Sequence, residues 1–254
     1  MKNIDLPERV VVTGGASGIG AAVARTFAES GSRVGIISRT QESISRVLDN
    51  ELRDLRDSIR WQIADVTDDT ALTAAIDTLA QELGGLDAVV ASAGIEGEMG
   101  ASVLEVTTDD FRRVLDVNVI GVFHTVKRSL PHLASSTHPS ITLVGSDSGF
   151  VAATGMLAYN ASKGALVQLT RALSLELFED HGIRVNSVCP SIVDTPMARR
   201  GMGVENFDDA DFPVNAAADV AWSIAYLASA RSRAVNGVNL LSDFGYSARS
   251  SFPA

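Results

Sequence analysis

The 254-residue sequence contains a single cysteine, Cys189. One cysteine cannot form a disulfide within the chain, and this usage is typical of proteins in the reducing cytoplasm. We therefore expect a cytoplasmic protein in which Cys189 is a small buried residue, with a reactive thiol as the alternative. The four histidines show no spacing typical of metal ligands, so we predict no metal site.

Basic residues are scarce as well. Lys and Arg number 21 against 31 Asp and Glu, which gives a formal net charge of −10. Nucleic acids and anionic membranes are bound by clustered basic residues, so the sequence predicts neither as a partner. No apolar run approaches the roughly 20 residues of a membrane span. The start, MKNIDLPERVVV, also lacks the apolar segment of a signal peptide.

Short runs of β-branched residues alternate with helical segments along the chain. The predicted strands are 9–14, 32–38, 59–65, 86–92, 140–146, 183–189 and 237–243. The predicted helices lie near 18–30, 41–56, 69–83, 108–133, 156–180 and 216–230. Several strands are continuously apolar, as expected when both faces of a sheet are covered. The pattern predicts a single α/β domain over 1–254, with a doubly wound parallel sheet of about seven strands and helices on both faces.

One segment breaks this alternation. Residues 197–215, MARRGMGVENFDDADFPVN, are rich in Gly and Asp with Met and Phe interspersed. Because the segment follows the end of a strand, we expect a mobile lid over a site; a solvated surface loop is the alternative.

A glycine-rich turn, TGGASGIG (13–20), follows the first predicted strand and leads into a helix. Gly14, Gly18 and Gly20 would let backbone N–H groups approach a pyrophosphate at the helix N-terminus. The spacing is not the standard G-x-G-x-x-G, and a simple tight turn is the alternative. Its place at the first strand–helix junction favours nucleotide binding.

The end of the second predicted strand indicates whether the nucleotide is NAD or NADP. An NAD site has an acid here for the adenosine ribose, yet no acid occurs between Ser32 and Gln41. The strand ends in ISRT, with Ser38 at the acid's place and Arg39 beside it. A guanidinium pairs well with a 2′-phosphate, so we favour NADP(H) over NAD(H). A solvated Arg39 at the helix entry is the alternative.

The helix YNASKGALVQLTRALSLEL (159–177) opens with Tyr159 and carries Lys163 one turn later. The chain has three tyrosines and three lysines, so a random order would place a lysine four residues after a tyrosine only about 0.04 times. A phenol titrates near pH 10. One ammonium about 5 Å away supplies about 3 kcal/mol, enough to lower that pKa by roughly 2 units. The pair therefore predicts acid–base chemistry, with a chance pair on a core helix as the alternative.

These motifs, together with Ser146 placed 13 residues before Tyr159, resemble the short-chain dehydrogenase/reductase family over nearly the whole chain. The resemblance implies a Rossmann-type fold and four catalytic residues. Tyr159 would exchange a proton with the substrate oxygen, and Lys163 would lower its pKa and bind the nicotinamide ribose. Ser146 would polarise the substrate oxygen, and Asn118 would connect the site to solvent protons.

The resemblance also implies the cofactor contacts. The expected cofactor-binding residues are Gly14, Ser17, Gly18, Ile19, Gly20, Ser38, Arg39, Asp65, Val66, Ser92, Ala93, Gly94, Tyr159, Lys163, Pro190, Ser191, Val193 and Thr195. Three positions depart from the family pattern. Ser92 replaces an asparagine, Ser191 replaces a glycine, and Phe244 stands where the family often has a glycine. None of the three removes a catalytic group.

The implied activity is that of an NAD(P)(H)-dependent oxidoreductase, an alcohol dehydrogenase or carbonyl reductase. The pocket wall is expected from 95–101, 149–157, 197–215 and the tail. Its apolar residues are Phe150, Met156, Leu157, Met197 and Phe212. They favour a neutral ketone or secondary alcohol, although a closing lid could bring Arg199 and Arg200 inward. The alternatives are a catalytically silent nucleotide-binding or scaffold protein, and a lyase or isomerase.

The resemblance finally implies a homotetramer, or a homodimer, in which the helices around Asn118 and after Tyr159 pack between subunits. The second of these helices has apolar residues on both faces, as burial in an oligomer requires. They are Leu166, Leu169, Leu173 and Leu177 against Val167 and Ala172. The tail, 244–254, would either close a neighbour's site or be frayed.

Overall fold

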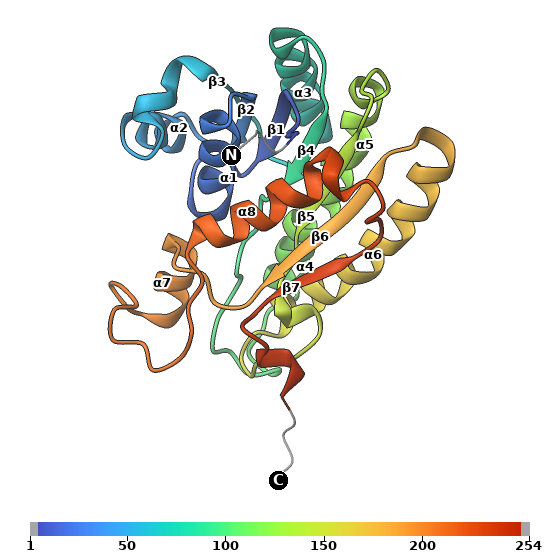
Figure 1. Ribbon diagram of the computed structural model, residues 1–254. Coiled ribbons are helices and arrows are strands. Elements are labelled where there is room, and N and C mark those ends of the chain that lie inside the picture. The colour runs from blue at the N-terminus through green and yellow to red at the C-terminus, as the bar shows by residue number, and fades with distance from the viewer. Residues whose placement is uncertain (1–4, 250–254) are drawn as a thin grey trace.

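The computed structural model describes residues 5–249 and contains one seven-stranded sheet (Figure 1). All paired strands are parallel, in the order β3-β2-β1-β4-β5-β6-β7. The strands are β1 (Arg9–Thr13), β2 (Arg33–Ser38), β3 (Ile59–Ile63), β4 (Ala88–Ala91), β5 (Ser140–Val144), β6 (Arg184–Pro190) and β7 (Asn239–Ser242). The predicted doubly wound parallel sheet is confirmed.

Helices cover both faces of this sheet (Figure 1). One layer consists of α1 (Gly18–Glu29), α2 (Gln41–Asp49) and α8 (Ala217–Ala228). The other consists of α3 (Asp69–Leu83), α4 (Thr108–Leu115), α5 (Gly121–Leu133) and α6 (Leu157–His181). A short helix, α7 (Pro196–Met202), lies beside the carboxyl ends of the strands.

The apolar runs of the strands follow from this two-sided cover. In β1, Val10 and Val12 join the core under α1 and α8, whereas Val11 joins the core under α3 and α6. All three are fully buried. Each such side chain contributes about 1.5–3 kcal/mol relative to exposure, so a strand buried on both faces is stabilised at every residue.

The strand order reverses at β1, which pairs with β2 on one side and with β4 on the other. The chains leaving the carboxyl ends of β1 and β4 then turn to opposite faces, which opens a crevice between them. Gly14, directly after β1, has φ +70°, and a Cβ there would lie 2.8 Å from the Ala93 backbone. Only glycine allows the two turns to pass this closely.

The helix predicted over 41–56 is shorter in the structure. α2 ends at Asp49, and a 3₁₀ helix, η1, spans Arg53–Ser58. Asn50 leaves helical geometry, with φ −120° and ψ −89°. This turn brings Leu52 into the core, where it is fully buried. Burial of Leu52 therefore overrides the local helical pattern.

The helix predicted over 108–133 is divided. A π-helical turn, η2 (Asp116–Ile120), separates α4 from α5. Such turns insert one extra residue into a helix and occur frequently at functional sites. Here the turn carries Asn118, which is 1% exposed.

The segment 197–215 is partly ordered as helix. α7 begins at Pro196, and the Thr195 hydroxyl caps it by accepting a hydrogen bond from the Ala198 N–H at 3.2 Å. Beyond Met202 the segment contains no further helix until α8, and Asn215 forms an isolated bridge with Val193. The structure thus places a helix where a loop was expected, and closure of a lid stays a prediction.

Candidate active site

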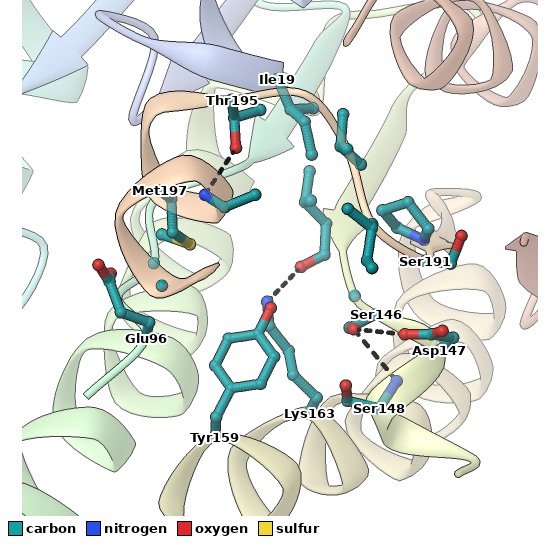
Figure 2. A pocket seen from close by; sticks show the side chains of 18 of the residues that line it. Ile19, Glu96, Ser146, Asp147, Ser148, Tyr159, Lys163, Ser191, Thr195 and Met197 are labelled. Atoms are coloured by element: carbon teal, nitrogen blue, oxygen red, sulfur yellow. Dashed lines mark hydrogen bonds between the residues drawn. The ribbon is translucent and has the colours of Figure 1, made fainter. Parts of the chain in front are cut away.

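A cavity of about 930 Å³ opens at the carboxyl ends of the central strands. It is lined by the glycine turn, the segment after β4, the segment after β5, the start of α6, the end of β6, α7 and the C-terminal segment. Figure 2 shows Ser146, Tyr159 and Lys163 within it, beside Thr195 and Met197. Residues distant in sequence therefore meet at the strand reversal, where doubly wound sheets bind nucleotides.

The first turn of α1 is suited to hold a phosphate group. Ser17 is its N-cap, yet its side chain makes no capping hydrogen bond, and the first turn contains no acidic residue. Ser17, Gly18, Ile19 and Gly20 of this turn line the cavity. An uncapped helix N-terminus binds anions through its backbone N–H groups and the helix dipole. The chain therefore fits a dinucleotide at this position.

Tyr159 and Lys163 lie one turn apart on α6, as their spacing predicts. The Lys163 Nζ atom lies 5.4 Å from the centroid of the Tyr159 ring and donates a hydrogen bond to the Val144 carbonyl oxygen at 2.9 Å. Lys163 is only 6% exposed. Its ammonium is thus fixed between the end of β5 and the phenol (Figure 2).

Burial decides the protonation of this pair. It raises the pKa of Tyr159 to about 12, a rise that the Ser146 hydroxyl opposes and the charge of Asp147 increases. Burial also lowers the pKa of Lys163 to about 8. Desolvation thus moves the pKa of Tyr159 in the direction opposite to the lowering expected from Lys163, and that lowering stays a prediction. Both groups therefore hold their protons at neutral pH.

Ser146 follows β5 and starts the 3₁₀ turn η3 (Asp147–Gly149). Its hydroxyl donates a hydrogen bond to Asp147 Oδ1 at 3.0 Å and accepts one from the Ser148 N–H at 3.1 Å. Both bonds are drawn in Figure 2. Ser146 is 6% exposed, so its orientation is fixed by these neighbours.

The Asn118 side chain is fully engaged. Its Oδ1 accepts a hydrogen bond from the Ile95 N–H at 2.8 Å, and its Nδ2 donates to the Ile95 carbonyl oxygen at 2.9 Å and to Ser162 Oγ at 3.0 Å. Asn118 does not line the cavity. It fixes the turn after β4 to α6, the helix that carries Tyr159.

Most of the expected cofactor residues line this one cavity. They are Gly14, Ser17, Gly18, Ile19, Gly20, Ser92, Ala93, Gly94, Tyr159, Lys163, Pro190, Ser191, Val193 and Thr195. Ser38, Arg39, Asp65 and Val66 lie outside its walls, at the carboxyl ends of β2 and β3. The Gly14 N–H donates to the Ile37 carbonyl oxygen at 2.9 Å, which joins the end of β2 to the glycine turn.

These four outer residues differ in their surroundings. Arg39 is exposed, and the Ser38 hydroxyl lies 2.8 Å from that of Ser43 on α2. Asp65 accepts a hydrogen bond from the Thr67 N–H at 2.9 Å, and Val66 is buried.

The pocket wall differs in part from the expected one. Met156, Met197 and Phe212 line the cavity, whereas Phe150 and Leu157 do not and are each 43% exposed. Arg199 and Arg200 also lie outside it. Arg199 pairs with Asp194 at 2.6 Å, and Arg200 pairs with Glu96 at 3.1 Å. The arginines of α7 are thus held by carboxylates outside or at the rim of the cavity.

The sequence expectation missed three carboxylates that line the cavity: Glu96, Asp147 and Asp243. The sequence could have indicated two of them as cavity residues, because Asp147 adjoins Ser146 and Glu96 lies in the predicted wall segment 95–101. Asp243 accepts hydrogen bonds from the Gly245 and Ser247 N–H groups, each at 2.9 Å. It thereby fixes the start of the C-terminal segment. The tail residues 250–254 lie outside the described residues.

Comparison with known proteins identifies the family. The family described as enoyl-(acyl carrier protein) reductase matches residues 14–247. The chain is 38% identical over 248 residues to cis-4-hydroxycyclohexanecarboxylate dehydrogenase of Sinomonas cyclohexanicum, covering 95% of this chain and 97% of that one. It is 34% identical over 245 residues to 2-(R)-hydroxypropyl-CoM dehydrogenase of Xanthobacter autotrophicus (strain ATCC BAA-1158 / Py2), covering 94% and 98%.

Solved structures agree. The structure of ElxO with NADP bound superposes with a TM-score of 0.85 at 27% identity, covering 96% of this chain and all of that one. The protein belongs to the short-chain dehydrogenase/reductase family. It is an enzyme of the alcohol dehydrogenase type found in that family.

The lowered pKa of Lys163 predicts a stability change with pH. An unfolded lysine keeps its proton to about pH 10.4, whereas folded Lys163 loses it near pH 8. Between these values the unfolded state binds more protons, so stability rises with pH. From pH 8 to about pH 10 the free energy of unfolding should gain about 2 kcal/mol from this group. Lys163→Met should remove that gain in urea unfolding.

The matched control for this measurement is Lys127→Met, because Lys127 is exposed on α5. Lys127→Met should keep the pH dependence of the natural protein. An undiminished gain in Lys163→Met would show that burial does not shift the Lys163 pKa.

Proposed function

We propose that this protein is an NAD(P)(H)-dependent oxidoreductase that interconverts a neutral, largely apolar ketone and its secondary alcohol. One observation carries the proposal. Ser146, Tyr159 and Lys163 line the same cavity as an uncapped helix N-terminus and its glycine turn. A hydroxyl, a phenol and an ammonium beside a nucleotide site are the groups that hydride transfer to a carbonyl requires.

The glycine turn and the first turn of α1 would hold the pyrophosphate. Ser92–Gly94, Pro190–Val193 and Thr195, which line the same cavity, would hold the nicotinamide end. The cofactor, when bound, supplies or accepts the hydride. The chain's own task is to orient the substrate, to hold its oxygen and to move one proton.

Tyr159 is the proton donor in the reducing direction. Its raised pKa keeps the phenol protonated at neutral pH, the form that donates to a carbonyl oxygen as negative charge develops there. Ser146 holds the same oxygen. Lys163, protonated below about pH 8, places a positive charge beside the phenol and stabilises its deprotonated form after transfer.

Asn118 contributes through position. Its side chain bonds both backbone groups of Ile95 and the Ser162 hydroxyl. Ser162 in turn donates to the Tyr159 carbonyl oxygen at 2.7 Å. Asn118 therefore sets the distance between the turn after β4 and the first turn of α6, on which the catalytic tyrosine stands.

Tyr159→Phe tests the catalytic assignment. The variant keeps the ring and its packing and loses only the proton donor, so kcat should fall by about 10²- to 10⁴-fold while NADPH binding is retained. Stopped-flow absorbance of the reduced nicotinamide and a fluorescence titration with NADPH give the two quantities. Tyr226→Phe, on exposed α8, is the control and should keep full activity. Undiminished turnover in Tyr159→Phe would refute the assignment.

The cofactor proposal favours NADP(H). Arg39 is exposed at the end of β2, and the Ser38 and Ser43 hydroxyls lie beside it. A guanidinium with two hydroxyls suits a phosphate monoester, and β2 itself ends without a carboxylate that would repel one. The relative with NADP bound is compatible with this preference.

Arg39→Ala tests the cofactor preference. The natural enzyme should have a higher kcat/KM with NADPH than with NADH. In the variant the ratio of these two kcat/KM values should fall about 10- to 100-fold, because a charge-assisted hydrogen bond to the 2′-phosphate is removed. Arg46→Ala is the control, since Arg46 is an exposed arginine on α2, the helix that follows Arg39. A natural enzyme that prefers NADH would contradict the proposal.

The substrate class follows from the cavity wall. Its substrate end is lined by Met99, Val151, Met156, Met197, Met202, Phe212, Phe244 and Tyr246. The acidic residues that line the cavity are Glu96, Asp147 and Asp243. The basic residues that line it are Lys163 and Arg249, and Arg249 is exposed. Such a wall favours neutral, apolar compounds over anions.

Two alcohols of similar ring size test this proposal. Cyclohexanol should be oxidised with a kcat/KM about tenfold or more above that of cis-4-hydroxycyclohexanecarboxylate, since about 1.4 kcal/mol of repulsion gives a factor of ten. Initial rates of nicotinamide reduction measure both. A preference for the carboxylate that disappears in Arg249→Ala would show that Arg249 makes the site select anions.

We also propose a cytoplasmic homotetramer. Within residues 5–249 no helix is long and apolar enough to cross a membrane. Two exposed apolar sets support assembly. Ile120 and Phe123 lie around the start of α5 and Leu175 and Phe178 on α6 of the same layer, whereas Trp222 and Tyr226 lie on α8 of the opposite layer. Two separate self-complementary patches are what a tetramer with two-fold axes requires.

Light scattering after size exclusion tests the assembly. The natural protein should elute at four chain masses, and Trp222→Arg should reduce it to two because a charge replaces an apolar contact. Trp61→Arg is the control, since Trp61 is an exposed tryptophan on the opposite edge of the sheet. A monomeric natural protein would contradict the proposal.

A further inference from the structure

Asp147 lies beside the reacting groups without a part in the mechanism above. It lines the same cavity as Tyr159, and its Oδ1 accepts the hydrogen bond that the Ser146 hydroxyl donates at 3.0 Å. Figure 2 shows Ser146 between Tyr159 and Asp147. The carboxylate therefore contacts the one hydroxyl that is expected to hold the substrate oxygen.

The hydrogen-bond capacity of Ser146 shows the consequence. A serine hydroxyl has one proton to donate and two lone pairs. The proton is given to Asp147, and one lone pair accepts the Ser148 N–H at 3.1 Å. Only a lone pair is left for the substrate. A carbonyl oxygen is itself an acceptor, so Ser146 can bond it only by withdrawing its proton from Asp147.

We propose that Asp147 is a positioning residue that, by taking up or releasing one proton, decides whether Ser146 can donate a hydrogen bond to a substrate carbonyl. With Asp147 ionised, the Ser146 proton is directed to the carboxylate. With Asp147 protonated, the carboxyl O–H donates to Ser146 Oγ, and the serine proton is released to the substrate oxygen. The proton comes from solvent, and no covalent bond other than its own O–H changes. This inference rests on the proposed function.

The surroundings of Asp147 make its protonation accessible. Burial raises its pKa, the hydrogen bonds from Ser146 and Ser148 oppose the rise, and the charge of Asp243 adds to it. Asp243 stays ionised, because the Ser247 hydroxyl and backbone N–H groups lower its pKa. Two carboxylates sharing a poorly hydrated region favour a proton on the less well bonded one.

The other titratable groups that face Asp147 titrate at higher pH. They are Cys189 on β6 and Tyr159 on α6, with Lys163 next to both. Burial raises the pKa of the Cys189 thiol, the pKa of Tyr159 is about 12 and that of Lys163 about 8. A change in kcat/KM at a pH below these pKa values therefore reports the titration of a carboxyl group.

The proposal predicts the pH dependence of carbonyl reduction. The protonated form of Asp147 is the active one, so kcat/KM falls as pH rises through the pKa of Asp147. Loss of one oxyanion donor costs about 10²- to 10³-fold in comparable sites. We expect a fall of about 10- to 100-fold, since a bound carbonyl can compete with the carboxylate for the serine proton.

The first experiment measures kcat/KM for cyclohexanone with NADPH from about pH 4.5 to pH 8, within the range where an elevated carboxyl pKa is visible. Asp147→Ala should lose the fall and keep the acid-side rate throughout. Glu96→Gln is the matched control: it removes a carboxylate that lines the same cavity and also raises the Tyr159 pKa, but forms no hydrogen bond with Ser146. It should keep the fall. A fall that persists in Asp147→Ala overturns the proposal.

The second measurement needs no turnover. Titration of carboxyl-labelled aspartates by ¹³C NMR, with Asp147 assigned from the signal lost in Asp147→Ala, gives its pKa directly. In Ser146→Ala the carboxylate loses its hydroxyl donor, so its pKa should rise further. An unchanged pKa overturns the coupling. If cyclohexanone is not reduced while the titration responds to Ser146→Ala, the proposed function fails and the coupling stands.

Discussion

The structure depends on one close approach between two stretches of backbone. After β1 the chain turns at Gly14 and passes the Ala93 backbone so closely that a single Cβ would overlap it. This contact joins the turns that follow β1 and β4, the two strands at which the sheet reverses. Because those turns diverge to opposite faces, the crevice, the uncapped α1 and the side chains of Ser146, Tyr159 and Lys163 all lie around this point.

Desolvation, more than charge pairing, determines the state of the site. Exclusion of water favours the neutral form of three groups. It raises the pKa of the Tyr159 phenol and of the Cys189 thiol, and it lowers the pKa of the Lys163 ammonium. Pairwise Coulomb reasoning from two residues on a helix predicts the opposite direction for Tyr159. The local environment therefore favours the protonated form of the Tyr159 phenol at neutral pH, which is the form that the proposed proton donor needs.

Family membership fixes the type of chemistry but leaves the detail to this chain's own residues. The relatives share about a third of their residues with it, and their names describe substrates that differ in size and charge. In this chain three carboxylates, Glu96, Asp147 and Asp243, lie among the residues that line the cavity. Of the three, Asp147 alone is hydrogen-bonded to Ser146, and repulsion of anions by the set is part of the proposed substrate preference.

The sequence by itself determined the parallel sheet, the glycine turn and the pairing of Tyr159 with Lys163, because strand burial and helical spacing are local properties. Only the tertiary structure decided the break after Asp49 and the π-helical turn around Asn118. Burial of Leu52 and the bonds of Asn118 to Ile95 are contacts that no local pattern encodes. It also decided the protonation of Tyr159, since a pKa depends on how much water the surrounding chain excludes.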